Sequence, residues 1–124
     1  MKKILIIDDE KPTLSMFRLF LDAYGYKVLT AENAAAGIEL FKKENPPVVF
    51  TDIKMPGMDG LEVLRQLKQI NPAVQVIVMT GHGDKDLTQQ ALELNATTFL
   101  NKPIGRKALD QALETAWQHL SENG

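Results

Sequence analysis

The sequence contains no cysteine and only two histidines, His82 and His119, among its 124 residues. The absence of cysteine excludes disulfide bonds, thiol nucleophiles and thiolate metal sites. Two histidines are too few for a metal site built from imidazole ligands. The candidate metal ligands that remain are therefore the oxygen atoms of carboxylates, hydroxyls and backbone carbonyls.

Long hydrophobic runs and an excess of charge of one sign are also missing. The longest apolar runs, such as residues 4–7, span about four residues, whereas a transmembrane helix needs about 20. The apolar stretch behind Lys2 and Lys3 stops at Asp8, too early for a signal peptide. We therefore expect a cytoplasmic chain without membrane contact. The 14 basic and 16 acidic residues nearly balance, and the resulting pI near 5.6 argues against direct nucleic acid binding.

What the sequence does contain is a regular alternation of expected strands and helices in one domain. Short apolar runs, typical of buried strands, are separated by segments whose apolar residues recur at helical spacing. Gly25 and Asn95 follow two of these segments, where a left-handed residue ends a helix. Such an alternation predicts an α/β fold in which helices cover both faces of a parallel sheet. The expected strands are residues 3–7, 26–30, 48–51, 75–79 and 98–100.

Polar residues follow these expected strands at the ends where parallel α/β sheets carry functional groups. Three carboxylates converge if the first and third strands are neighbours, as they are in a sheet of order 2-1-3-4-5. Carboxylates so close repel each other, and a divalent cation together with a nearby ammonium group would relieve the repulsion. The residues concerned are Asp8 and Asp9 after the first strand, Asp52 after the third, Thr80 and Gly81 after the fourth, and Lys102 after the fifth.

The chemistry that this set of residues supports is phosphoryl transfer. Oxygen ligands select Mg²⁺, Mn²⁺ or Ca²⁺ over zinc or copper, and Mg²⁺ commonly keeps waters and phosphate oxygens in its shell, which suits a phosphate-handling role. A carboxylate such as Asp52 can act as the nucleophile and become an aspartyl phosphate. Thr80, the amide of Gly81 and Lys102 would then hold the transferred group. Each residue alone has an ordinary structural explanation, but their joint occurrence at strand ends favours a site.

The sequence resembles the receiver domain of two-component response regulators. The resemblance covers the whole chain in the order and spacing of the family, and it implies a flavodoxin-like, doubly wound (βα)5 sheet of order 2-1-3-4-5. We expect residues 1–124 to form a single receiver domain, with no output domain in this chain. The matching segments are Ile6-Ile7-Asp8-Asp9-Glu10, Asp52-Ile53-Lys54-Met55-Pro56-Gly57-Met58-Asp59-Gly60, Met79-Thr80-Gly81, and Ala96-Thr97-Thr98-Phe99-Leu100-Asn101-Lys102-Pro103.

The resemblance also implies roles for individual metal-binding residues. Asp52 would be the phosphoacceptor. Asp9, Asp52 and the backbone carbonyl of Lys54 would bind Mg²⁺ directly, and Asp8 would act through metal-bound water.

Further roles concern the phosphoryl group and the switch. Lys54, Thr80, Gly81 and Lys102 would contact the phosphoryl group, and Thr80 with the aromatic Phe99 would form the switch. The peptide bond between Lys102 and Pro103 would be cis.

The function implied is that of a phosphorylation switch rather than a turnover enzyme. A histidine kinase or a small donor such as acetyl phosphate would phosphorylate Asp52. The face built from the fourth helix, fifth strand and fifth helix would change and control a partner protein or output domain. Slow self-dephosphorylation would reset the switch, and His82, two residues after Thr80, would influence its rate. The chain would be a monomer or a phosphorylation-dependent dimer.

Three alternatives are weaker on the residues. An aspartyl-nucleophile phosphatase resembles Asp-x-Asp at the nucleophile, but Lys54 stands where the second acid would be. A flavodoxin-like or nucleotide-binding module would need a phosphate-cradling loop after the first strand, whereas the loop here begins with three acids. A pseudo-receiver that signals without phosphorylation does not need the complete set of acids, Thr80 and Lys102.

Overall fold

The computed structural model describes residues 2–123, which form five strands and five helices in strict alternation. All pairings between the strands are parallel, and their order in the sheet is β2-β1-β3-β4-β5. The α/β fold and strand order expected from the sequence are thereby confirmed. The elements are β1 (Lys3–Ile7), α1 (Lys11–Ala23), β2 (Lys27–Ala31), α2 (Ala34–Glu44), β3 (Val48–Asp52), α3 (Gly60–Ile70), β4 (Gln75–Thr80), α4 (Lys85–Glu93), β5 (Thr98–Asn101) and α5 (Arg106–Asn123).

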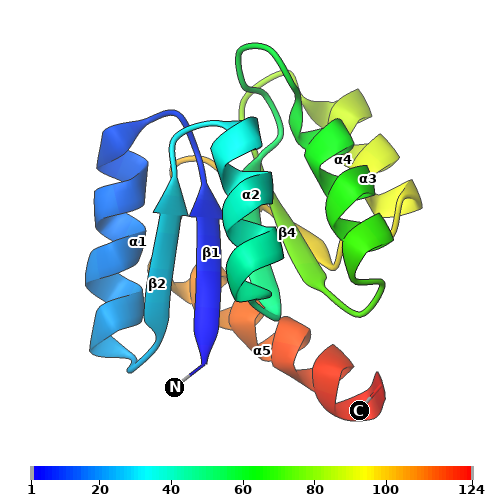
Figure 1. The fold of residues 1–124 in the computed structure, drawn as a ribbon. Coiled ribbons are helices and arrows are strands. Elements are labelled where there is room, and N and C mark those ends of the chain that lie inside the picture. Colours follow the sequence, from blue (N-terminus) through cyan, green and yellow to red (C-terminus); the bar gives the residue numbers. More distant parts are fainter. Residues whose placement is uncertain (1, 124) are drawn as a thin grey trace.

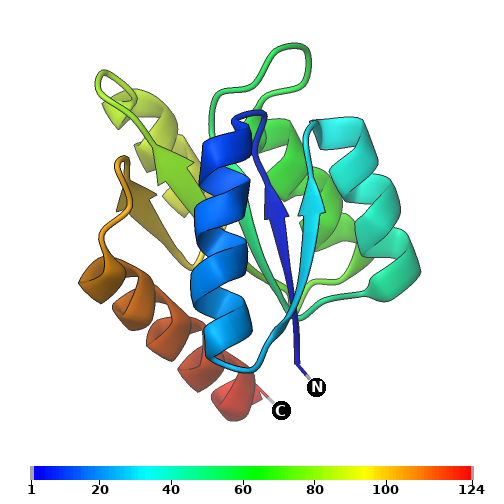
Figure 2. The ribbon, with the colours of Figure 1, turned by 90° about the vertical axis from the view of Figure 1, so that its left-hand side faces the viewer.

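The helices form two layers on opposite faces of the sheet (Figures 1 and 2). Helices α1 and α5 cover one face, and helices α2, α3 and α4 cover the other. Each layer has its own hydrophobic core, with Phe17 and Phe50 in the first and Phe41 and Leu64 in the second. The central strands β1, β3 and β4 are buried on both sides, which explains the apolar runs at residues 4–7, 48–50 and 76–79.

The observed element boundaries differ from the expected ones by single residues. Residues 26–30 were the expected second strand, but β2 begins at Lys27, because the amide of Tyr26 donates to the carbonyl of Leu21 and completes the end of α1. Gly25 and Asn95 have positive φ angles of 90° and 71°, as their expected positions after helices require. The peptide bond between Lys102 and Pro103 is cis. None of the described residues belongs to a helix that is both long and apolar enough to cross a membrane.

The turn between β3 and α3 has two glycines with different structural roles. Gly57 adopts a φ of 85°, which side chains disfavour and which suits a tight turn after Pro56. Gly60, the first residue of α3, lies against the end of β3. A Cβ atom there would collide with the backbone carbonyl of Asp52 and come within 2.6 Å of the Cα of Ile53. Asp59 caps the helix by accepting a hydrogen bond from the amide of Glu62 at 3.0 Å.

Candidate functional site

The carboxyl ends of the strands meet at one edge of the sheet, and the expected site residues follow from them (upper edge in Figure 1). Asp52 is the last residue of β3 and Thr80 the last residue of β4. Asp8 directly follows β1, and Lys102 directly follows β5. The sheet order therefore places β1, β3, β4 and β5 side by side, with a polar group at the end of each.

Lys102 is the centre of a charged cluster in the site. Its ammonium group lies 2.8 Å from Oδ2 of Asp8, 2.8 Å from Oε1 of Glu10 and 3.1 Å from Oδ2 of Asp52. The side chain of Asp8 is completely buried, and that of Asp52 is nearly so, whereas Glu10 is exposed to solvent. One cation thus faces three carboxylates, and the cluster carries excess negative charge.

This environment shifts the ionisation of three groups. Burial raises the pKa of Asp52, and the negative charge of Asp8 adds to the effect, while hydrogen bonds from Lys102 and from the amide of Lys54 oppose it. Burial would lower the pKa of Lys102, but hydrogen bonds to Asp8, Glu10 and Asp52 outweigh it and hold this pKa above its usual range. The hydrogen bond from Lys102 lowers the pKa of Glu10. Lys102 therefore remains charged at neutral pH.

The three acids around Lys102 also form a candidate metal site. Among the described residues, one carboxylate oxygen from each of Asp8, Glu10 and Asp52 lies within 4.8 Å of the others. Oxygen donors of this kind suit Mg²⁺. The residues present therefore fit a divalent cation at this edge of the sheet.

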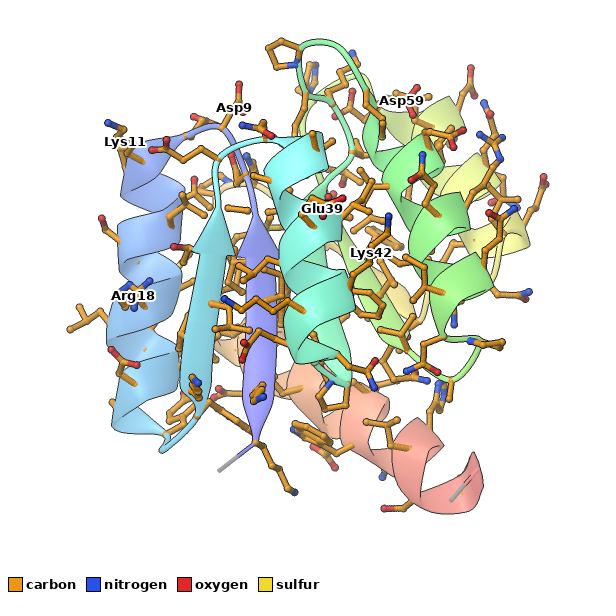
Figure 3. All side chains as sticks on the ribbon, in the orientation of Figure 1. Asp9, Lys11, Arg18, Glu39, Lys42 and Asp59 are labelled. Carbon is orange, nitrogen blue, oxygen red and sulfur yellow. The ribbon has the colours of Figure 1, made fainter. Side chains whose placement is uncertain are left out.

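Asp9 is placed differently from the other expected ligands. Its side chain is exposed and points away from the protein on the loop between β1 and α1 (Figure 3). The structure instead brings Glu10 into the cluster, a residue to which the sequence analysis assigned no role. Glu10 occupies the position before α1 but makes no capping hydrogen bond with its side chain, because its carboxylate turns to Lys102. The direct bond from Asp9 to Mg²⁺ remains a prediction.

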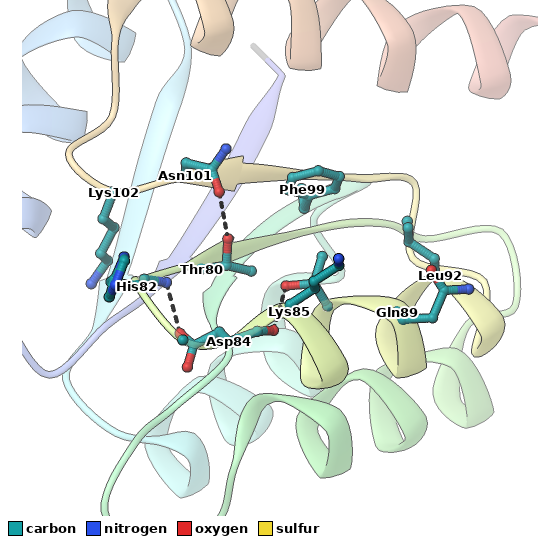
Figure 4. Close-up of a pocket in the computed structure, with 12 residues that line it drawn as sticks. Thr80, His82, Asp84, Lys85, Gln89, Leu92, Phe99, Asn101 and Lys102 are labelled. Atoms are coloured by element: carbon teal, nitrogen blue, oxygen red, sulfur yellow. Dashed lines mark hydrogen bonds between the residues drawn. The ribbon is translucent and has the colours of Figure 1, made fainter.

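The hydroxyl of Thr80 is engaged on the side of β5. It donates a hydrogen bond at 3.1 Å to Oδ1 of Asn101 and lies 3.4 Å from the carbonyl oxygen of Leu100. Thr80 is buried, whereas the expected switch residue Phe99 is about two fifths exposed. Both residues line a pocket of about 520 Å³ between α4 and β5 (Figure 4). The two expected switch residues therefore border one shared space.

Lys54 and Gly81 contact a residue that the sequence analysis did not single out. The ammonium group of Lys54 lies 2.9 Å from Oδ1 of Asp84, and the amide of Gly81 donates to Oδ2 of Asp84 at 2.7 Å. The amide of Lys54 points back to Asp52, with 3.4 Å to Oδ1. Asp84 is buried, and sequence alone gives no signal for it beyond a position before a helix.

The comparisons with known proteins agree with this geometry. The family model of the response regulator receiver domain matches residues 4–114, so the chain belongs to the receiver domains of two-component response regulators. Proteins of this family take phosphoryl groups from histidine kinases, control output domains and bind Mg²⁺ at an acidic pocket.

Individual relatives support the same assignment. The chain is 37% identical over 103 residues to sporulation initiation phosphotransferase F of Bacillus subtilis (strain 168), which covers 83% of either protein. It is 40% identical over 114 residues to the C4-dicarboxylate transport transcriptional regulatory protein DctD of Pseudomonas aeruginosa; the match covers 92% of this chain but a quarter of DctD. A crystal structure of a response regulator receiver domain protein from Clostridium thermocellum superimposes with a TM-score of 0.95 at 36% identity, covering both chains completely.

Proposed function

We propose that Asp52 is the phosphoacceptor of this receiver domain. The observation that carries the proposal is the position of Lys102, whose ammonium lies 3.1 Å from the Asp52 carboxylate at the carboxyl edge of the sheet. This contact supplies a positive charge beside a nearly buried nucleophile. The same ammonium can follow the negative charge from the carboxylate to a transferred phosphoryl group.

The reaction with a small donor balances without a further reactant. An oxygen of the Asp52 carboxylate attacks the phosphorus of acetyl phosphate, the bond from phosphorus to the acetyl oxygen breaks, and acetate leaves with the electron pair. Hydrolysis of the aspartyl phosphate consumes one water, releases inorganic phosphate and restores the carboxylate. A phosphohistidine of a histidine kinase replaces acetyl phosphate as the donor in signalling.

The residues that would hold Mg²⁺ are Asp52, Asp9 and the carbonyl of Lys54, with Asp8 acting through metal-bound water. The cation, when bound, neutralises charge on the phosphoryl oxygens. Lys102 would neutralise part of the same charge from its position beside Asp52. Glu10, which shares Lys102 with Asp8 and Asp52, adds an acid to this site, and Mn²⁺ would be an alternative cation.

The signal leaves the site through Thr80 and Phe99. A phosphoryl group on Asp52 adds about two negative charges and offers the Thr80 hydroxyl a stronger acceptor than its present partners on β5. Movement of Thr80 toward Asp52 would free space in the pocket for Phe99. The surface of α4, β5 and α5 would then change, which supports control of a partner protein or output domain through this face. The phosphorylated fraction sets how much of the protein occupies this second state.

Intact mass spectrometry after incubation with acetyl phosphate and Mg²⁺ tests the proposal. The wild-type protein should gain the mass of one phosphoryl group, and Asp52→Asn should gain none. Asp59→Asn serves as the matched control, because Asp59 caps α3 and should leave the gain intact. Phosphorylation of the Asp52→Asn variant to the wild-type extent would overturn the assignment.

A further inference from the structure

Asp84 connects the two loops that flank the phosphorylation site. Its Oδ1 pairs with the ammonium of Lys54 on the loop after β3, and its Oδ2 accepts the amide hydrogen of Gly81 on the loop after β4. The side chain is 6% exposed, whereas that of Lys54 is 63% exposed. Asp84 thus holds a buried negative charge between donors on two different loops. Figure 4 shows its hydrogen bond to the loop after β4.

The backbone of Asp84 is fixed as firmly as its side chain. Asp84 precedes the first residue of α4, where aspartate commonly caps a helix, yet its side chain makes no capping hydrogen bond. It turns back to Gly81, whose carbonyl in return accepts the amide of Asp84 at 3.3 Å. The hydroxyl of Thr88 donates to the carbonyl of Asp84 at 2.8 Å. These contacts hold the backbone of Asp84 at the junction between the Gly81 loop and the start of α4.

Both partners of Asp84 are groups that the proposed function needs at Asp52. Gly81 follows Thr80, and its amide has a single hydrogen to donate. That hydrogen is already bound by a charged acceptor at 2.7 Å. A phosphoryl oxygen on Asp52 can accept it only if Asp84 gives it up, and the ammonium of Lys54 is held in the same way.

We propose that Asp84 is a positioning residue that holds the Gly81 amide and the Lys54 ammonium away from Asp52 in the unphosphorylated protein. The inference rests on the proposed function of Asp52. The phosphoryl group and the Asp84 carboxylate compete for the same donors. The strength of the Asp84 contacts therefore sets how readily the phosphorylated arrangement forms.

Equilibrium binding of trifluoroberyllate, a non-covalent phosphoryl analogue, in the presence of Mg²⁺ tests this competition. The variants are Asp84→Asn, which removes the charge, and Asp84→Ser, which retains a good helix-capping residue and guards against a folding defect of the first. Asp86→Asn is the matched control, since Asp86 is an exposed acid of α4. The half-saturating concentration and the hydrogen exchange of the Gly81 amide are followed by NMR for each protein.

We expect both Asp84 variants to bind the analogue severalfold more tightly than the wild type and to exchange the Gly81 amide faster before it is added. The control should match the wild type in both. A merely structural role predicts the reverse for binding, because a distorted loop would weaken it. Unchanged or weaker binding by the two variants would overturn the inference. If the wild type neither binds the analogue nor gains a phosphoryl group, the proposed function fails first, and the role of Asp84 falls with it.

Discussion

The ammonium of Lys102 lies 3.1 Å from the carboxylate of Asp52 although 50 positions separate the two residues in the sequence. The same ammonium lies 2.8 Å from Asp8 and from Glu10. With all four groups ionised the cluster has one positive and three negative charges. The structure therefore combines strong local attraction with a surplus of negative charge, and both properties can be measured separately.

Replacement of Lys102 should destabilise the protein in the absence of Mg²⁺. Lys102→Met leaves the buried Asp8 and Asp52 without their cation, and we expect a loss of about 2 kcal/mol in the free energy of unfolding at pH 7. Addition of Mg²⁺ should restore part of the loss, because the ion replaces the missing charge. Urea denaturation with and without Mg²⁺ measures both effects. Lys107→Met, the same change at an exposed position of α5, should cost little; an equal loss in both variants would contradict the expectation.

Replacement of Asp8 should have the opposite effect. Asp8→Asn removes one of three crowded negative charges and retains an oxygen that can accept the hydrogen bond from the Glu10 amide, which now lies at 2.8 Å. A relief of about 1 kcal/mol would raise the melting temperature by about 4 °C without Mg²⁺. The gain should be present at pH 7 and shrink as acidification neutralises the neighbouring acids. Calorimetry at pH 7 and at acidic pH tests this expectation. A lower melting temperature for the variant than for the wild type at pH 7 would show that the ion pair with Lys102 outweighs the repulsion.

The raised pKa of Asp52 should be visible in a titration of the metal-free protein. Burial raises this pKa above the ordinary aspartate value of 3.8, and the negative charge of Asp8 adds to the shift. Asp8→Asn removes that charge and should therefore lower the pKa of Asp52 toward its ordinary value. NMR titration of the Asp52 carboxyl carbon without Mg²⁺, in the wild type and the variant, measures the difference. Equal pKa values in the two proteins would rule out the influence of Asp8.

His82 should influence how long the phosphoryl group persists. It lies with Lys102 at one end of the pocket between α4 and β5 (Figure 4), and both also line a second cavity beside α1. An imidazole here can order or obstruct the water that attacks the aspartyl phosphate, so His82→Ala should change the rate of phosphate release severalfold. A phosphate-release assay measures the rate. His119→Gln is the control, since His119 contacts Gln75 at the opposite end of β4; a rate that His82→Ala leaves unchanged would remove the idea.

The fold was predictable because buried strands and the ends of helices have different, recognisable sequence patterns. Buried strands contain short apolar runs, such as residues 48–50 of β3, and glycine or asparagine follows helices where a left-handed residue is needed. Single-residue differences arose where a backbone group had two possible partners. The amide of Tyr26 donates its hydrogen bond to the end of α1 and not to a neighbouring strand. The local sequence does not decide between these two partners.

The site was predictable in its backbone positions but less so in its side-chain directions. The expected strand ends located the backbones of four site residues, and parallel pairing brings these strand ends to one edge of the sheet. The four residues are Asp8, Asp52, Thr80 and Lys102. Nothing in the local pattern showed that the carboxylate of Glu10 would contact Lys102 while that of Asp9 points away from the protein. These choices depend on the position of Lys102, which comes from a distant part of the chain.

The contact between Gly60 and the end of β3 has a consequence for mutational studies. Because the first residue of α3 abuts the main chain of Asp52 and Ile53, even a methyl group added at Gly60 would push on the backbone of the proposed phosphoacceptor. A loss of signalling in such a variant would therefore come from a displaced Asp52 backbone, although all side chains of the proposed site are still present. The absence of a side chain at Gly60 thus lets α3 approach the end of β3, and a side chain there would displace the carboxylate that we propose as phosphoacceptor.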